Sequence, residues 1–161
     1  MKFYSIANSI DYRNLTINAL GIFFLCISLL SLTAPLIQSL NGYPSGEGLY
    51  SFLSPICHQY PTRSLWIMER PFALCTRCFS GYLGLGIGMI FIRPNYFYFR
   101  RLLIGMLLLL PGVLDGVIQL LTDYESNNFT RAFTGLVAGV GLYFILCPFK
   151  IKKQNQTQKR S

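Results

Sequence analysis

The sequence predicts an all-α integral membrane protein: one domain with four transmembrane helices in an antiparallel bundle, and one surface loop with a short interfacial helix. The chain of 161 residues is 52% hydrophobic and 12% charged, with a mean hydropathy of +0.43, which is too apolar for an ordinary soluble domain. Four segments are long enough to cross the roughly 30 Å hydrocarbon layer, which takes about 20 residues as a helix. Basic residues lie between and beyond these runs, so the net charge of +8 indicates membrane topology and not nucleic-acid binding.

The expected helices cover residues 15–38, 72–92, 102–121 and 130–149 of a single membrane domain, 1–161. The first includes "LGIFFLCISLLSL" and follows Lys2 and Arg13. Its apolar core is too long for a cleavable signal peptide and no A-x-A site follows, so we expect a permanent anchor.

The long connection, residues 39–71, is expected to lie on the membrane surface as an outer loop. Its early "NGYPSGEG" has the composition of turns. After Pro61, Thr62 is expected to cap a short helix that runs to Glu69 and ends before Pro71. Trp66 is interpreted as an interfacial anchor.

Basic residues concentrate on cytoplasmic loops, so their distribution orients the helices. With the amino terminus inside, the cytoplasmic side has ten basic residues and the outer side has four. The ten are Lys2, Arg13, Arg93, Arg100, Arg101, Lys150, Lys152, Lys153, Lys159 and Arg160, and the four are Arg63, Arg70, Arg77 and Arg131. We therefore expect a multi-pass protein of the cell membrane with both termini cytoplasmic, including the polar tail at 151–161.

The inner loop "RPNYFYFRR" interleaves arginines with aromatic residues. At a membrane interface this pattern is explained by an aromatic belt and by contacts with anionic lipid. The second, third and fourth expected helices each carry a G-x-x-x-G spacing, at Gly84 and Gly88, Gly112 and Gly116, and Gly135 and Gly139. Small residues at this spacing let helix backbones approach closely, within the chain or with a partner protein.

Asp115 lies in the third expected helix, 14 residues after Arg101 and so about 21 Å along the helix from the inner surface. A carboxylate at this depth is costly and should face the protein interior with a partner. Gln119 is one turn further on, and Pro111 favours a kink just before. Arg131, after the outer connection "TDYESNNFTR", is the expected ionic partner of Asp115 or of Glu125. Both a fixed ion pair and a functional role remain open.

Three of the five cysteines, Cys57, Cys75 and Cys78, fall within 22 residues together with the only histidine, His58. Cys26 and Cys147 lie within helices and are interpreted as small apolar residues. A C-x-x-C pair with Cys57 and His58 provides three thiolates and one imidazole, a set that zinc favours. Adjacent side chains often diverge, however, which counts against Cys57 and His58 both being ligands.

Two other interpretations of these thiols stay open. In the first, Cys57 forms a static disulfide with one member of the pair, which leaves one thiol unpaired. In the second, Cys75 and Cys78 are a redox pair at the start of a helix, where the helix dipole and Arg77 favour the thiolate, and Cys57 is the resolving thiol. The architecture resembles that of membrane enzymes that generate disulfides with quinone, although those enzymes have a second cysteine pair.

A closer resemblance rests on three motifs in order: "CHQYPTRS...CTRCFSGYLG", "PGVLDGVIQ" and "ESNNFTRAFTG". This run, which covers about half of the chain, resembles the small membrane proteins named domain of unknown function 2085. The family pattern falls on Cys57, His58, Gln59, Arg63, Ser64, Cys75, Arg77, Cys78, Gly81, Tyr82, Asp115, Gly116, Gln119, Glu125, Ser126, Asn128, Arg131, Thr134 and Gly135. The resemblance implies a polytopic membrane protein and no particular reaction.

The leading hypothesis is therefore a transition-metal site, zinc first, whose ligands are Cys57, His58, Cys75 and Cys78. Asp115, Gln119 and Arg131 are the candidate catalytic residues behind it. The alternatives are a thiol-disulfide oxidoreductase that uses quinone, and a non-catalytic assembly subunit whose glycine faces pack against membrane partners. The expected partner in every case is the lipid bilayer. The sequence shows no phosphate-binding loop, nucleophile motif or dinucleotide fingerprint, so it names no substrate.

Overall fold

The computed structural model describes residues 12–92 and 98–146. The expected cytoplasmic tail, Cys147 and the last three residues of the fourth expected helix lie outside this range. The described elements are five α-helices, two 3-10 turns and one two-stranded hairpin. In chain order they are α1 Tyr12–Asn41, α2 Glu47–Leu53, η1 Ser54–Ile56, η2 Pro61–Arg63, β1 Ser64–Ile67, β2 Arg70–Cys75, α3 Thr76–Phe91, α4 Tyr98–Leu121 and α5 Asn128–Leu146.

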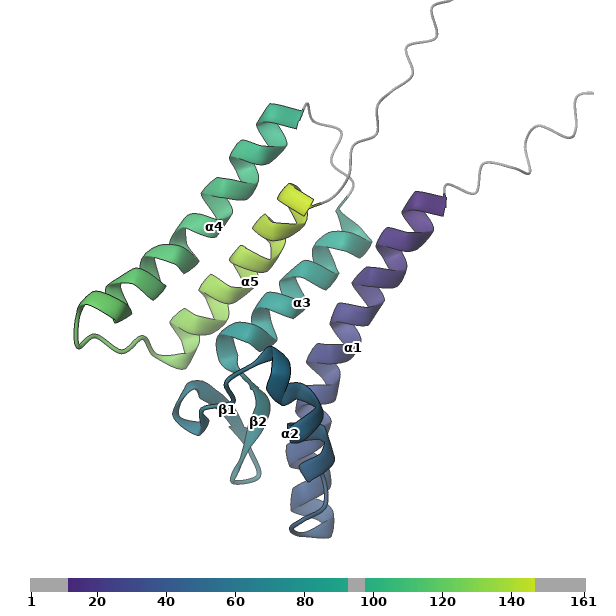
Figure 1. Cartoon of the computed structure of the whole chain (residues 1–161), viewed down its shortest axis with the longest axis vertical. Coiled ribbons are helices and arrows are strands. Elements are labelled where there is room, and N and C mark those ends of the chain that lie inside the picture. Colours follow the sequence, from purple (N-terminus) through teal and green to yellow (C-terminus); the bar gives the residue numbers. More distant parts are fainter. Residues whose placement is uncertain (1–11, 93–97, 147–161) are drawn as a thin grey trace, which may run out of the picture.

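The four long helices form a row in the order α4, α5, α3, α1 (Figure 1). This arrangement corrects the predicted antiparallel bundle in two ways. The helices are arranged side by side in one layer, and the central pair, α3 and α5, runs parallel, while α1 is antiparallel to α3 and α4 is antiparallel to α5. Apolar periodicity indicates how many helices there are, but it does not specify which helices become neighbours.

The glycines explain why α3 and α5 lie so close together. A Cβ on Gly84 would overlap the backbone carbonyl of Leu136, and a Cβ on Gly139 would overlap that of Gly81. The other two contacts in the row also contain glycines: Gly105 and Gly141 between α4 and α5, and Gly21 and Gly86 between α1 and α3. The glycine faces that the sequence offers for helix packing are therefore filled by helices of the same chain.

Three described helices are long and apolar enough to cross a membrane, in the ranges Leu15–Asn41, Phe99–Leu121 and Asn128–Leu146. The second expected span, 72–92, does not form one continuous helix. Its first residues belong to β2, and α3 contains 16 residues, about 24 Å of helix. The predicted helix included the apolar residues Phe72, Ala73 and Leu74. A short run of buried apolar residues shows neither the helical nor the strand period, so the sequence does not distinguish the two.

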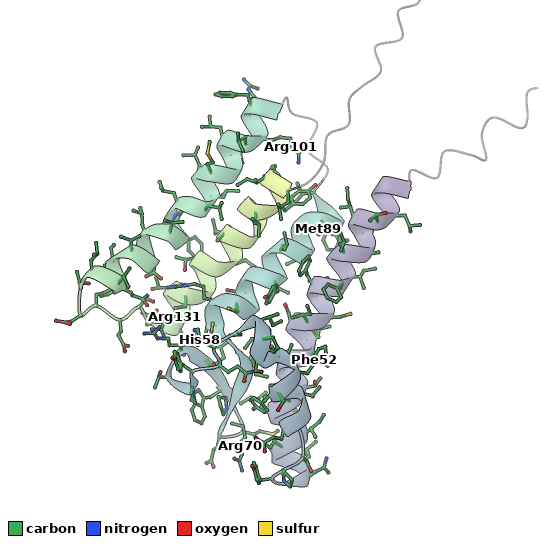
Figure 2. All side chains as sticks on the ribbon, in the orientation of Figure 1. Phe52, His58, Arg70, Met89, Arg101 and Arg131 are labelled. Carbon is green, nitrogen blue, oxygen red and sulfur yellow. The ribbon has the colours of Figure 1, made fainter. Side chains whose placement is uncertain are left out.

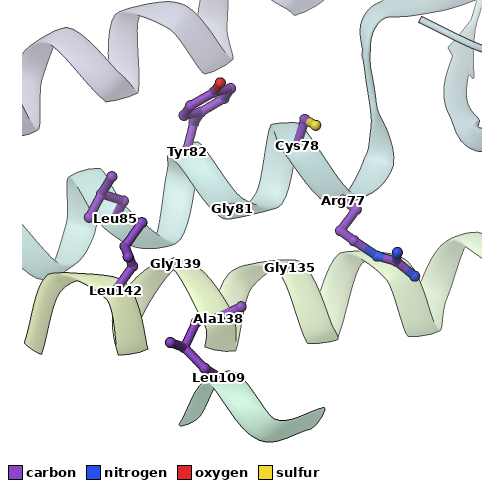
Figure 3. Close-up of a pocket in the computed structure, with 10 residues that line it drawn as sticks. All are labelled: Arg77, Cys78, Gly81, Tyr82, Leu85, Leu109, Gly135, Ala138, Gly139 and Leu142. Carbon is purple, nitrogen blue, oxygen red and sulfur yellow. The ribbon is translucent and has the colours of Figure 1, made fainter. Parts of the chain in front are cut away.

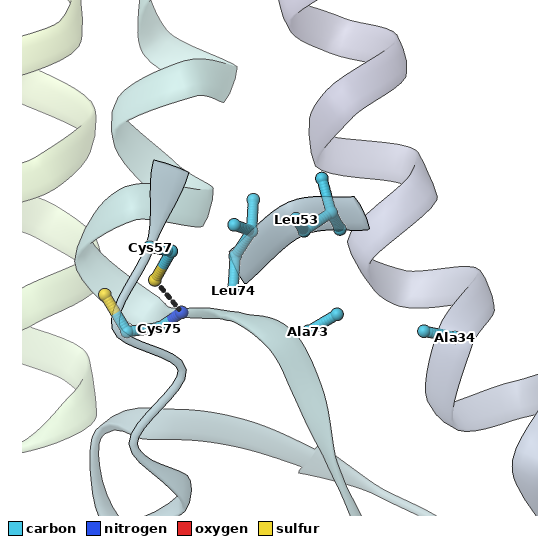
Figure 4. Close-up of a cluster of buried hydrophobic side chains, with 6 residues drawn as sticks. All are labelled: Ala34, Leu53, Cys57, Ala73, Leu74 and Cys75. Carbon is cyan, nitrogen blue, oxygen red and sulfur yellow. Dashed lines mark hydrogen bonds between the residues drawn. The ribbon is translucent and has the colours of Figure 1, made fainter. Parts of the chain in front are cut away.

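The long connection between α1 and α3 contains a small α/β unit in place of the expected loop. The helix predicted from Thr62 to Glu69 is wrong: these residues form η2, β1 and the hairpin turn, and the short helix of the connection is α2. Met68 and Glu69 at the turn have φ angles of 48° and 61°. This unit packs on the end of α1 through a cluster of buried apolar residues, which includes Ala34, Leu53, Ala73 and Leu74 (Figure 4).

Candidate thiol site

Three cysteine side chains meet where the α/β unit joins α3. Cys57 follows η1, Cys75 is the last residue of β2 and Cys78 lies in the first turn of α3. Their Sγ atoms all lie within 4.8 Å of one another. All three are free thiols, Cys57 and Cys75 are buried and Cys78 is partly buried. The structure thus brings together three of the four ligands that the sequence predicts.

Backbone hydrogen bonds position these sulfur atoms. The N–H of Cys75 donates to the Sγ of Cys57 over 3.2 Å (Figure 4), and the N–H of Cys78 donates to the Sγ of Cys75 over 3.5 Å, so that Cys75 caps the amino terminus of α3. Such bonds favour thiolates, the form in which cysteine binds metals.

Gln59 holds the segment that follows Cys57 against β2. Its side-chain amide donates to the carbonyl oxygens of Tyr50, over 2.7 Å, and of Ala73, over 2.8 Å. The φ angle of Gln59 is 54°, a left-handed conformation that is unusual outside glycine, asparagine and aspartate. The turn brings Cys57 back toward Cys75, which explains why a glutamine stands two residues after the first thiol.

Hydrogen bonds within the cluster favour the thiolate form of Cys57. Hydrogen bonds from the thiols of Cys75 and Cys78, and from the N–H of Cys75, lower the pKa of Cys57 far below that of a free cysteine, although burial opposes the shift. The pKa of Cys75 is raised, chiefly because its proton is held in the hydrogen bond to Cys57. Of these two thiols, Cys57 is therefore the one whose thiolate is favoured.

His58 lies outside the group of three thiols. Its side chain is exposed, its Nδ1 accepts a hydrogen bond from the N–H of Tyr60 over 3.1 Å, and its ring is 4.5 Å from the Tyr60 ring. Since consecutive residues of an extended segment point to opposite sides, Cys57 turns inward and His58 turns outward.

A second polar cluster joins α3, α4 and α5 near the same end of the row. Arg77 donates from Nη2 to Oδ2 of the buried Asp115, and Gln119 also donates to this oxygen, over 3.2 Å. Gln119 donates as well to the hydroxyl of Ser126, which accepts a bond from Nε of Arg131 over 3.2 Å. Asp115, Gln119 and Arg131 thus belong to one hydrogen-bonded network, which runs through the hydroxyl of Ser126.

The expected ionic partner of Asp115 is wrong, because the pair is formed by Arg77 and not by Arg131. Glu125 pairs instead with Arg63, at 3.7 Å. Arg131 is 5% exposed, and it donates hydrogen bonds to the Ser126 hydroxyl, the Thr62 carbonyl and the Asn128 side-chain oxygen. Figure 2 shows Arg131 and His58 toward the end of the row where the α/β unit lies, and Arg101 toward the opposite end.

The model of a family described as a predicted membrane protein, domain of unknown function 2085, matches residues 57–145. The chain belongs to this family. An uncharacterised protein of Methanocaldococcus jannaschii is 38% identical over 110 residues, which cover 62% of this chain and 67% of the relative. An uncharacterised protein of Methanothermobacter thermautotrophicus is 38% identical over 89 residues, which cover 54% of this chain and 80% of the relative. No solved structure matches the chain.

The match to domain of unknown function 2085 begins at Cys57 and contains all three thiols and the whole Asp115 network. Helices α1 and α2 precede it. Within the matched region, the roles of Arg77 and Asn128 were missed by reasoning from the sequence alone. Asn128 accepts from the hydroxyl of Thr76 and donates to the carbonyl of Ser64, the strand partner of Cys75, so it connects α5 to the thiol site. A buried Asp115 within an apolar span requires a cationic partner, so every arginine near that end of the helices, including Arg77, is a candidate.

Proposed function

We propose that Cys57, Cys75 and Cys78 bind a single transition-metal ion, zinc first. The observation that carries this proposal is the grouping of three Sγ atoms, within 4.8 Å of one another, from three different elements. Around zinc, Zn–S bonds of about 2.3 Å in a tetrahedron place the sulfur atoms roughly 3.8 Å apart. The cluster needs to contract by about 1 Å at most, which rotation about the Cys side-chain torsions supplies.

Three thiolates leave one tetrahedral position for a fourth ligand. His58 is adjacent in sequence and would need to give up its contact with Tyr60 and turn inward to reach it. Without His58, this position is open to a water molecule or to a substrate. Asp115, one of the candidate catalytic residues, is already bonded to Arg77 and Gln119. This favours an architectural role for the network, and we assign no reaction to the site.

We further propose that the protein crosses the cell membrane four times. Helix α3 lies between α1 and α5, both long and apolar enough to span, so it must share their depth despite its 16 residues. An even number of crossings puts Tyr12 and Leu146 on the same side, and the distribution of basic residues makes this side cytoplasmic. The thiol site then lies on the outer side.

The main alternative is a membrane thiol-disulfide oxidoreductase. It is favoured by the position of Cys75 at the amino terminus of α3, next to two other free thiols. In this function, Cys75 and Cys78 form a disulfide and release two electrons and two protons, which reduce a quinone to a quinol, and Cys57 is the resolving thiol. The third hypothesis, an assembly subunit, rested on glycine faces that could pack against partner proteins. It is now less well supported, because helices of the same chain fill these faces.

Elemental mass spectrometry of the full chain, purified in a mild detergent, tests the metal proposal. We expect close to one zinc per chain, loss of the metal in the Cys75→Ser/Cys78→Ser variant, and retention in Cys26→Ser, whose thiol is exposed on α1. Metal-free protein in the parent chain would contradict the proposal. A disulfide that reductant opens and quinone restores would then establish the redox alternative.

A further inference from the structure

An apolar groove lies over the contact between α3 and α5, beside α4 (Figure 3). Its volume is about 240 Å³. Gly81, Gly135 and Gly139 form part of its lining, together with the larger side chains of Tyr82, Leu85 and Leu142. The missing side chains of the glycines, which allow the two helices to touch, also leave this hollow beside them. Its lining is suited to a hydrocarbon chain and not to water.

One end of the groove is polar, because Arg77 and Cys78 are also in its lining. A third of the Arg77 side chain is exposed, and Nη2 is bonded to Asp115. Its Nε is buried and has no acceptor among the described residues. A guanidinium group has five N–H donors in a planar fork, so Arg77 retains donors for a second anion after its pairing with Asp115.

The depth of Arg77 is suited to a lipid headgroup. Helix α3 extends for about 24 Å, and Arg77 is its second residue. Arg77 is 14 residues, about 21 Å, from Phe91 at the other end of α3. With that end at the inner boundary of a hydrocarbon layer about 30 Å thick, Arg77 lies roughly 9 Å below the outer boundary. A phosphate group at the outer surface can reach this depth where the bilayer is locally thinned around a short span.

We propose that the groove binds one acyl chain of an anionic phospholipid, whose phosphate accepts hydrogen bonds from Arg77. Arginine and phosphate form short, charge-assisted and often bidentate hydrogen bonds. The headgroup of this lipid lies next to Cys78 and thus covers one side of the thiol site. The proposal requires that the helices are embedded in a bilayer, but it does not require a bound metal.

Native mass spectrometry of the full chain in detergent, titrated with phosphatidylglycerol or with phosphatidylcholine of identical chains, tests this site. We expect one phosphatidylglycerol per chain, bound about tenfold or more tightly than phosphatidylcholine, as a charge-assisted hydrogen bond predicts. The Arg77→Gln/Asp115→Asn variant removes both charges together, so no buried ion is left alone, and it should bind the two lipids equally.

A matched pair of leucine variants tests the groove separately. Leu142→Trp adds bulk to the groove wall and should weaken binding of both lipids, whereas Leu107→Trp, on a part of α4 that does not line the groove, should bind them as the parent chain does. The proposal would be overturned if the parent chain bound the two lipids equally or if the double variant kept the preference for phosphatidylglycerol. It would also be overturned if the two leucine variants did not differ. Retention of an isoprenoid phosphate or a second copy of the chain in place of phosphatidylglycerol would likewise overturn it. Metal content measured on the same samples separates this outcome from that of the metal proposal.

Discussion

Arg77 of α3 donates a hydrogen bond to the carboxylate of Asp115 of α4, although α5 lies between these two helices in the row. The pair therefore spans the face of α5 and connects three helices near the ends that face the α/β unit. Asp115 is 8% exposed, so its charge depends on Arg77 and on the additional bond from Gln119. In an apolar surrounding, the loss of either partner leaves one buried charge without a counter-charge, which destabilises the folded state.

Replacing Asp115 alone should destabilise the protein. Asp115→Asn leaves the Arg77 cation without its counter-charge, and we expect the free energy of unfolding to fall by about 2–3 kcal/mol. This loss is at or below the range for a fully buried pair, because Arg77 is partly exposed. Arg77→Gln/Asp115→Asn should recover part of this loss. Thermal unfolding in detergent measures the effect, with the exposed Asp123→Asn as the control. A double variant less stable than both single variants would argue against the pair.

Gly84→Ala should separate α3 from α5. The added methyl group would overlap the Leu136 carbonyl, and overpacking of this kind costs about 1–3 kcal/mol, or more where backbone must move. Gly48→Ala in α2 is the matched control, since a Cβ there meets nothing within 4 Å, and it should be neutral or slightly stabilising. Unfolding midpoints of the two variants in the same detergent provide the comparison. Equal midpoints would mean that the tight contact of α3 and α5 is absent in the membrane.

Metal binding should release about two protons per ion near neutral pH and not three, because hydrogen bonds lower the pKa of Cys57 and favour its thiolate before the metal binds. The lowered pKa of Cys57 means that this sulfur gives up no proton to the metal, while the raised pKa of Cys75 means that its proton must be displaced. Affinity for zinc should therefore rise with pH, by about 100-fold per pH unit while two thiols remain protonated. Calorimetry in buffers of different ionisation enthalpy counts the protons. Release of three would show that Cys57 is protonated in the metal-free site.

The two residues after Cys57 should differ in their effect on metal affinity. His58→Ala removes an exposed side chain and should leave the dissociation constant for zinc unchanged. Gln59→Ala removes the two hydrogen bonds that hold this segment to Tyr50 and Ala73, and should weaken binding by about 10-fold or more, as for other groups that orient ligands. Competition with a zinc-sensitive dye measures both constants. Loss of the metal in His58→Ala would instead identify the imidazole as the fourth ligand.

The long helices and the grouping of the thiols follow from local features of the sequence. Runs of about 20 apolar residues predict α1, α4 and α5 because a bilayer demands that length, and the buried Asp115 stands out against such a run. The hairpin could not be predicted in this way. A tight two-residue turn with positive φ at both positions usually contains Asn-Gly or Asp-Gly, whereas here it contains Met68 and Glu69. Tertiary contacts impose this conformation, and the local sequence does not indicate it.

The choice of Arg77 over Arg131 as the partner of Asp115 also depends on tertiary structure. Both arginines lie near the amino-terminal ends of their helices. Distance along the sequence favours Arg131, which follows Asp115 after one short connection. The parallel packing of α3 on α5 places Arg77 within reach, and this packing depends on contacts of Gly81 and Gly84 across the two helices. In the same way, the segment 57–60 directs Cys57 and His58 to opposite sides, which composition alone does not reveal.

The difference in length between neighbouring helices has a consequence for exchange at the thiol site. Helix α1 is 14 residues longer than α3, about 21 Å, and the α/β unit packs against the extra length of α1, next to the start of α3. The sulfur atoms consequently lie beneath a cap of folded protein, with Cys57 and Cys75 at 8% and 4% exposure. An ion can pass Cys57 and Cys75 only when this cap opens locally, whereas Cys78 is partly exposed and lines the groove. For an ion held by all three sulfur atoms, we therefore expect exchange with the surroundings to be slow on the covered side and to depend on local opening of the cap.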